Sequence, residues 1–201
     1  SGKSSLINLI PRLFDTTEGT ILINNQNIKN LNLSSHRSKI GIVPQDAFLF
    51  SETIKNNLTF GNKTASEDEI IKATTTAGIH SNIINFKEGY DTVIGERGVM
   101  LSGGQKQRIT IARAILNNPE LLILDDSLSA VDTQTEHQIL ENFKESIKQK
   151  TAILVSHRIS TTKLADKIIV LKNGTISEEG THDELMKKEG TYKRLFPEQT
   201  S

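Results

Sequence analysis

The sequence predicts an α/β fold in which a mostly parallel sheet is flanked by helices. Two short segments, Thr20–Asn24 and Lys39–Val43, are rich in Ile and Val, as strands are. Three nearly continuous apolar runs predict strands buried on both faces, as in parallel sheets; they are Glu120–Asp125, Thr151–Ser156 and Lys167–Lys172. Because helical patterns lie between these runs, we expect alternating strands and helices around one sheet.

The helical patterns lie in three parts of the chain. Residues 103–116 and 132–147 carry apolar side chains at helical spacing. Residues 66–86 have no strong strand pattern, and Ser66 with Glu69 has the spacing of a capping box. We therefore expect a helix to begin at this serine.

The helical patterns also suggest how the chain is organised. We place a mainly helical subdomain at residues 46–101 and assign 1–45 and 102–201 to the α/β core. The chain begins at Ser1 inside a motif, so we expect it to be a fragment of a longer protein.

Composition excludes several classes of protein. The chain has 201 residues, with 24 Lys and Arg against 24 Asp and Glu, and so lacks the basic excess of a nucleic-acid binder. The absence of cysteine excludes disulfides and thiolate metal sites. No apolar run approaches the ~18 residues that suggest a membrane-spanning helix.

The first residues contain half of a phosphate-binding loop. A full loop reads G-x-x-x-x-G-K-[ST], and Gly2, Lys3 and Ser4 match its second half. The glycine lets the backbone approach phosphates, the lysine pairs with them, and the serine hydroxyl holds Mg²⁺. The match is short, so the same residues could form only an exposed basic turn.

A more specific motif begins a predicted helix. The segment reads LSGGQKQR, and it places Ser102, Gly103 and Gly104 where backbone amides and a hydroxyl can bind an anion. The alternative is a glycine-rich turn capped by serine. The sequence that follows, RITIARAILNNPELLILDD, makes that alternative a poor explanation.

Two adjacent carboxylates follow the apolar run that starts at Leu121. Asp125 lies at the carboxyl end of a predicted strand, where α/β folds bind ligands, and its carboxylate suits Mg²⁺. Asp126 follows directly and needs a separate role.

Together these motifs resemble the nucleotide-binding domain of ABC transporters, over nearly the whole chain and in the family's order. The resembling segments are SGKSS (Walker A), Val43–Asp46 with Gln45 (Q-loop), LSGGQ (signature), LLILDD (Walker B), Ser129–Asp132 (D-loop) and His157 (switch histidine). The resemblance implies a P-loop NTPase fold over 1–201, with ATP and Mg²⁺ as ligands.

The resemblance also implies a role for each motif residue. Implied nucleotide contacts are Gly2, Lys3, Ser4, Ser5, Ser102, Gly103, Gly104, Gln105 and Asp132. Implied Mg²⁺ ligands are Ser4, Gln45 and Asp125. Implied catalytic residues are Asp126, His157 and Gln45. The other histidines, His36, His80, His137 and His182, are expected at the surface.

Three further segments resemble exporters within the family. They are Asp46–Gly61, Val93–Gln105 (which contains GERG, near the helices that couple the domain to the membrane in exporters) and Lys172–Met186. The resemblance implies a transmembrane domain upstream, a position at the cytoplasmic face of the cell membrane, and no nucleic-acid partner.

One residue departs from the family pattern. Asp126 stands where the family usually has Glu, which positions the attacking water, and it is one methylene shorter. The departure resembles the degenerate subunit of heterodimeric bacterial multidrug exporters, whose partner carries Glu. Such a subunit would have a weak site of its own and would lend its intact signature to the partner.

Other interpretations stay open. They are a homodimeric exporter in which Asp126 suffices, a soluble ABC ATPase, and a regulatory subunit that binds ATP without turnover. The upstream half of the phosphate loop and its strand are missing, so we expect this piece alone to bind ATP poorly and to aggregate.

Overall fold

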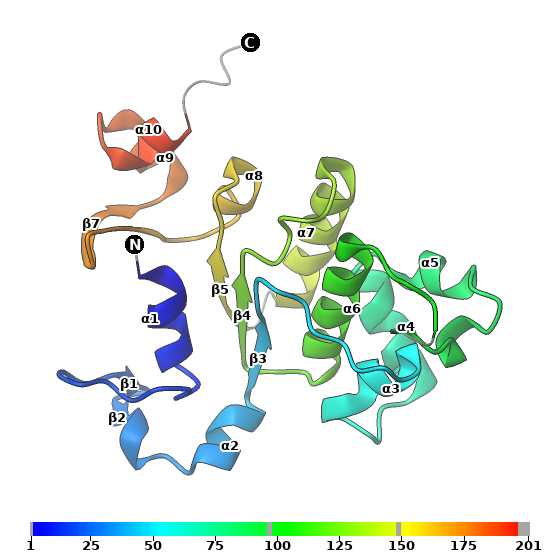
Figure 1. Cartoon of the computed structure of the whole chain (residues 1–201). Helices are drawn as coiled ribbons and strands as arrows, with labels where there is room; N and C mark the ends of the chain where they lie inside the picture. Colours follow the sequence, from blue (N-terminus) through cyan, green and yellow to red (C-terminus); the bar gives the residue numbers. More distant parts are fainter. Residues whose placement is uncertain (1, 96–97, 148–149, 197–201) are drawn as a thin grey trace. The chain divides into compact units, whose positions relative to one another are not determined.

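The computed structural model describes residues 2–95, 98–147 and 150–196 (Figure 1). Its internal contacts define two compact units, one formed by 38–153 and the other by 1–37 with 154–201. Glu96 and Arg97 of the GERG segment lie outside the described residues. The predicted division into core and helical subdomain is drawn differently from these two units and stays a prediction.

A parallel pair of strands is central to the unit of residues 38–153. β3 and β4 run parallel, with Ile40 opposite Leu121 and Val43 opposite Leu124, in a sheet of order β3-β4-β5. The three strands are β3 (Ile40–Val43), β4 (Leu121–Asp125) and β5 (Thr151–Val155). Their positions confirm three of the predicted strands.

Among the described residues, the same unit contains seven helical segments. They are α3 (Ile54–Leu58), η2 (Thr59–Gly61), α4 (Glu67–Thr76), α5 (His80–Ile84), η3 (Gly89–Asp91), α6 (Gly103–Leu116) and α7 (Thr133–Ile147). α6 packs against β3, α3 and α4, and Ile109 and Ile111 are fully buried. The predicted capping box is confirmed, because Ser66 N donates to Glu69 Oε2 at 2.7 Å and Glu69 N donates to Ser66 Oγ at 3.3 Å.

The second unit is built from short elements. They are α1 (Lys3–Leu9), β1 (Leu22–Ile23), β2 (Gln26–Asn27), η1 (Ile28–Asn30), α2 (Leu33–Ser38, whose last residue belongs to the other unit), α8 (Ile159–Thr162), β6 (Ile168–Lys172), β7 (Thr175–Gly180), α9 (His182–Lys187) and α10 (Thr191–Leu195). Its buried cluster joins β6 to the last two helices through Ile168, Val170, Leu185 and Tyr192.

One strand prediction is wrong in kind. The run Lys167–Lys172 forms β6, but β6 pairs antiparallel with β7 and leaves Ile169 51% exposed, so it is not buried on both faces. Asn173 and Gly174, with φ of 52° and 79°, connect the two strands in the left-handed conformation that tight hairpins require. The Asn-Gly pair is a hairpin signal, and it explains the antiparallel partner.

The histidine predictions are partly wrong. His36 is buried at 7% exposure, and its Nε2 lies 2.7 Å from the Ile10 carbonyl oxygen. His80 and His182 are half-buried, each with Nδ1 hydrogen-bonded to a tyrosine hydroxyl. A hydrogen-bond partner for one ring nitrogen lowers the free-energy cost of burying an imidazole. The sequence does not reveal such partners. His137 is exposed, as predicted.

Candidate functional site

The partial phosphate loop lies at the beginning of α1. Gly2 has a φ of 84°, a left-handed conformation that glycine adopts without strain, and α1 begins at Lys3. Ser4 and Ser5 are exposed in the first turn. The loop therefore presents a lysine and two hydroxyls together.

The structure brings the predicted switch histidine to this loop. His157 follows β5, and its Nε2 lies 3.4 Å from Lys3 Nζ. An ammonium group only donates, so a hydrogen bond between the two requires the imidazole nitrogen that faces it to accept. Both residues that the sequence assigns to the terminal phosphate thus converge in one place.

The adjacent carboxylates lie at the carboxyl end of β4. Asp125 is 9% exposed, while Asp126 has a φ of 45° and is half-buried. Asp tolerates the left-handed region better than most residues. Gln45 follows β3, and the parallel register means that it leaves the sheet at the same edge as the two carboxylates.

The groups at this edge fit Mg²⁺. Carboxylate and amide oxygens are the ligands of hard cations, and Ser127 Oγ beside them is buried without a hydrogen-bond partner in the described part of the chain. Among the described residues no cluster of three or more His, Cys, Asp or Glu side chains forms a metal cage. Few protein ligands suit Mg²⁺, which is usually completed by water and substrate phosphates.

The signature segment caps α6. Ser102 N donates to Gln105 Oε1 at 2.9 Å, and Gln105 N donates to Ser102 Oγ at 3.2 Å. A Cβ on Gly104 would lie 2.9 Å from the Ala130 carbonyl oxygen, so only glycine fits there. The signature and D-loop segments are therefore in direct backbone contact.

Asp132 has a structural role in the D-loop. Its Oδ1 accepts a hydrogen bond from Thr135 N at 2.9 Å, which caps α7. This hydrogen bond, above all, lowers the pKa of the Asp132 carboxyl below its usual value. The Asp132 carboxylate therefore has a structural partner within its own chain. Its contact with a nucleotide stays a prediction.

Two buried amides near these segments were missed by sequence reasoning. Gln107 is 4% exposed and contacts the backbone of both the Q-loop and the D-loop. Asn57 is fully buried, and its side chain bonds the amide and the carbonyl of Phe50 at 2.8 and 3.0 Å. A polar residue in the middle of a helix gives no sequence signal of such a contact.

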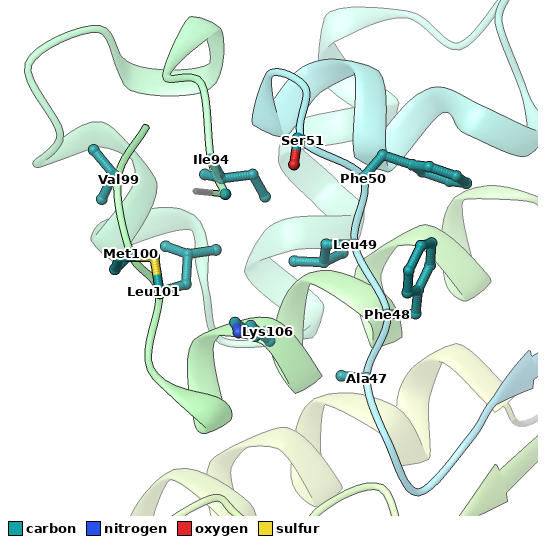
Figure 2. A pocket seen from close by; sticks show the side chains of 11 residues that line it. Ala47, Phe48, Leu49, Phe50, Ser51, Ile94, Val99, Met100, Leu101 and Lys106 are labelled. Atoms are coloured by element: carbon teal, nitrogen blue, oxygen red, sulfur yellow. The ribbon is translucent and has the colours of Figure 1, made fainter. Parts of the chain in front are cut away.

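An apolar groove lies beside the Q-loop segment. Figure 2 shows residues 47–51 along one side, with Ile94 and residues 99–101 on the other. The groove has a volume of about 270 Å³ and includes Gly95 and Lys106 in its lining. Backbone hydrogen bonds from Ile54 N to Thr92 O and from Ile94 N to Glu52 O hold its two sides together.

Exposed aromatic rings lie beside this groove. The Phe48 and Phe50 ring centroids are 5.1 Å apart, and Phe60 stacks on Phe50 at 4.6 Å. Phe48 and Phe60 are 62% and 61% exposed. Grooves of this kind are typical of protein interaction surfaces.

Comparison with known proteins decides the family. The family model described as ABC transporter matches residues 1–129. The chain belongs to the ABC transporter family. It is a nucleotide-binding domain of that family. Members of the family bind ATP, generally with Mg²⁺, and hydrolyse it.

The relatives and the solved structure that this ABC transporter domain resembles are described as exporters. It is 53% identical over 195 residues to the "Putative multidrug export ATP-binding/permease protein YgaD" of Bacillus subtilis (strain 168). It is 51% identical over the same length to a protein with the same descriptive name from Staphylococcus aureus (strain NCTC 8325). Each match covers 97% of this chain and 34% of the relative, so the chain spans about a third of these proteins.

The fold prediction is confirmed by structure. A bacterial Atm1-family ABC exporter with ATP bound matches with a TM-score of 0.93 and 40% identity, over 100% of this chain and 35% of that one. The P-loop NTPase fold of an exporter's nucleotide-binding domain is thus established. None of the helices described for this ABC transporter domain is long and apolar enough to cross a membrane.

Proposed function

We propose that this chain is the ATP-binding domain of a multidrug-type ABC exporter, which couples ATP binding and hydrolysis to export across a membrane. The observation that carries the proposal is the combination of an intact signature segment, capped by Ser102 and in contact with the D-loop, with an apolar groove beside the Q-loop. The relatives named as multidrug export ATP-binding/permease proteins support it.

In this proposal the chain's own residues bind and orient ATP. Gly2, Lys3, Ser4 and Ser5 contact the phosphates, and His157 beside Lys3 contacts the terminal one. Ser4, Gln45 and Asp125 hold Mg²⁺, which would neutralise charge that develops on the phosphates.

The signature segment serves a second ATPase domain. Ser102, Gly103, Gly104 and Gln105, with Asp132 of the D-loop, face a nucleotide that the partner's phosphate loop holds. The Gly103 and Gly104 amides lie at the start of a 14-residue helix, a position that suits an anionic ligand.

We place this chain in the subunit with the degenerate catalytic site. Asp126 would orient the attacking water, and its carboxylate is one methylene shorter than the Glu expected in the partner. A displacement of about 1 Å costs on the order of 100-fold in rate. Hydrolysis would then take place mainly at the site where the partner's Glu meets this chain's signature.

The apolar groove is the docking surface for the permease domain. Its lining is mainly apolar, with Ser51 and Lys106 as its polar residues, and the exposed aromatic rings beside it suit an amphipathic helix from a fused permease. The domain would work at the cytoplasmic face of the membrane, with a transmembrane partner and no nucleic-acid partner.

ATP-driven dye transport tests the proposal. The full-length protein, purified with its partner subunit and reconstituted in vesicles, should move ethidium only with ATP and Mg²⁺, and Lys3→Ala should weaken ATP binding at this chain's own site. ATP turnover without any transport or membrane association would favour a soluble ABC ATPase instead.

A further inference from the structure

We propose that Gln107 is a positioning residue that links the Q-loop to the D-loop. The inference deepens the proposed function and rests on it, because it concerns how the docking groove and the nucleotide-facing segments communicate. It assigns a role to a side chain that lies outside both loops.

The contacts of Gln107 define a two-ended link. Its Nε2 donates to the Gln45 carbonyl oxygen at 3.3 Å, and its Oε1 accepts from Ala130 N at 3.1 Å. The first partner can only accept and the second can only donate, which fixes the orientation of the amide. Because the side chain is only 4% exposed, water cannot readily replace either partner.

The D-loop end of the link also packs against Gly104 of α6. Ala130 packs so closely on Gly104 that a Cβ there would lie 2.9 Å from the Ala130 carbonyl oxygen. Two residues further along, Asp132 caps α7. The D-loop backbone is therefore fixed to α6 by a hydrogen bond at one peptide and by close packing at the next carbonyl.

The Q-loop end leaves the Gln45 side chain free for other contacts. The link uses only the Gln45 backbone carbonyl, and the Gln45 residue is exposed. The same helix holds this segment again at Phe48, whose carbonyl accepts from Arg113 Nη2 at 2.8 Å. Two side chains of α6 thus hydrogen-bond to backbone carbonyls of the segment that borders the groove.

A displacement of the Q-loop should therefore act on the D-loop through Gln107. α6 is a buried helix, with Ile109 and Ile111 fully buried, and it transmits small shifts as a rigid element. If docking in the groove moves residues 45–48, then Gln107 either carries Ala130 with it or loses a hydrogen bond. Gln107 thus couples the movement of the Q-loop to that of the D-loop.

Three variants of the assembled transporter test this link. Gln107→Met keeps the volume and removes both hydrogen bonds. Gln107→Glu keeps the acceptor for Ala130 N–H and loses the donor to Gln45. Thr110→Val is the matched control, because Thr110 is 1% exposed on the same helix and its hydroxyl bonds only the Lys106 carbonyl of α6.

Kinetics give the first readout. We expect Gln107→Met and Gln107→Glu to lower kcat about tenfold, as expected for one or two lost hydrogen bonds, while KM for ATP changes less than about twofold. Thr110→Val should change neither. Equal kcat in Gln107→Met and wild type, or a loss matched by Thr110→Val, would overturn the proposal.

Amide hydrogen exchange gives a readout that does not need turnover. Gln107→Met should speed exchange in peptides that contain Ala130 and residues 45–48, whereas Gln107→Glu should keep Ala130 protected. If the wild-type transporter hydrolyses no ATP, the proposed function fails, and exchange alone decides the link. Unchanged exchange in Gln107→Met would refute it.

Discussion

At the scale of single residues, backbone conformation and buried amides matter more than charge. Asp126 occupies a left-handed turn with a φ of 45°, directly after the last residue of β4. A short polar side chain suits that turn, so the choice of Asp there has a backbone reason as well as a catalytic consequence. Asn57 has the larger structural role, because it holds a loop through three hydrogen bonds.

Replacing Asn57 by Ala should destabilise the domain by about 1–3 kcal/mol, because the Phe50 amide loses its partner and the Phe50 and Thr53 carbonyls each lose one of two hydrogen bonds. Urea unfolding of the ATP-binding domain measures this loss. Asn56→Ala is a suitable control, since Asn56 is exposed and its side chain bonds only Glu52. A change below about 0.5 kcal/mol for Asn57→Ala, the level expected of surface substitutions, would contradict the assigned role.

At the scale of elements, several helices begin with a side-chain cap. α4, α6 and α9 each begin with a capping box, and α7 begins with the Asp132 cap. The sequence pattern predicted the box of α4 and the start of α6, but it treated a serine cap at α6 only as the alternative to an anion site. It did not predict that Gln107 and Asn57 bind loops, because such contacts join residues whose proximity no local pattern encodes, up to 62 positions apart.

The strands too were predicted only where a local sequence pattern marks them. The apolar runs predicted where β3, β4, β5 and β6 lie, since burial of a strand shows in its composition. They did not predict β7, whose sequence Thr175–Gly180 is mainly polar. It forms a strand because the Asn173-Gly174 turn returns the chain beside β6, and that pairing is decided by the turn.

The capping carboxylates should make stability depend on pH. Hydrogen bonds from Ser66 and Thr181 lower the pKa of Glu69 and Glu184, and the bond from Thr135 lowers the pKa of Asp132. A lowered folded-state pKa stabilises above the unfolded value, about 4, and this stability is lost as the pH falls through the folded pKa. We expect the free energy of unfolding to fall with the pH below about 4.

Urea unfolding across this acidic range measures the effect. Glu69→Gln keeps an acceptor for the Ser66 amide but does not titrate, so its stability should decline less steeply with falling pH than that of the wild type. Glu67→Gln is the control, because Glu67 is exposed and its lysine neighbour lies 3.9 Å away. Parallel pH profiles for Glu69→Gln and wild type would contradict the expectation.

At the scale of the whole molecule, we propose that the apolar groove connects the domain to a permease. The sequence did not predict this groove, although the segments that line it, within 46–61 and 93–105, resemble exporters. The motif order predicted the family, but no motif in the sequence indicates a transported substrate.

A charge in the groove should uncouple transport from ATP turnover. Met100 lines the groove and is 72% exposed, so Met100→Lys should leave the fold intact and lower ethidium-stimulated turnover about tenfold, as expected when ~1.4 kcal/mol of docking energy is lost. Ile176→Lys is the control, because Ile176 is 59% exposed on β7 and lies outside the groove lining. Full stimulation in Met100→Lys would exclude the groove as the docking surface.

The most direct test of the central claim is ATP turnover by the full-length protein purified alone, wild type beside Asp126→Glu. The degenerate-subunit account predicts a nearly inert wild type and a gain on the order of 100-fold in the variant, which His157→Ala should abolish. Equal and substantial turnover by both proteins would contradict it. In that case Asp126 suffices as it stands, and the chain belongs to a competent homodimeric exporter.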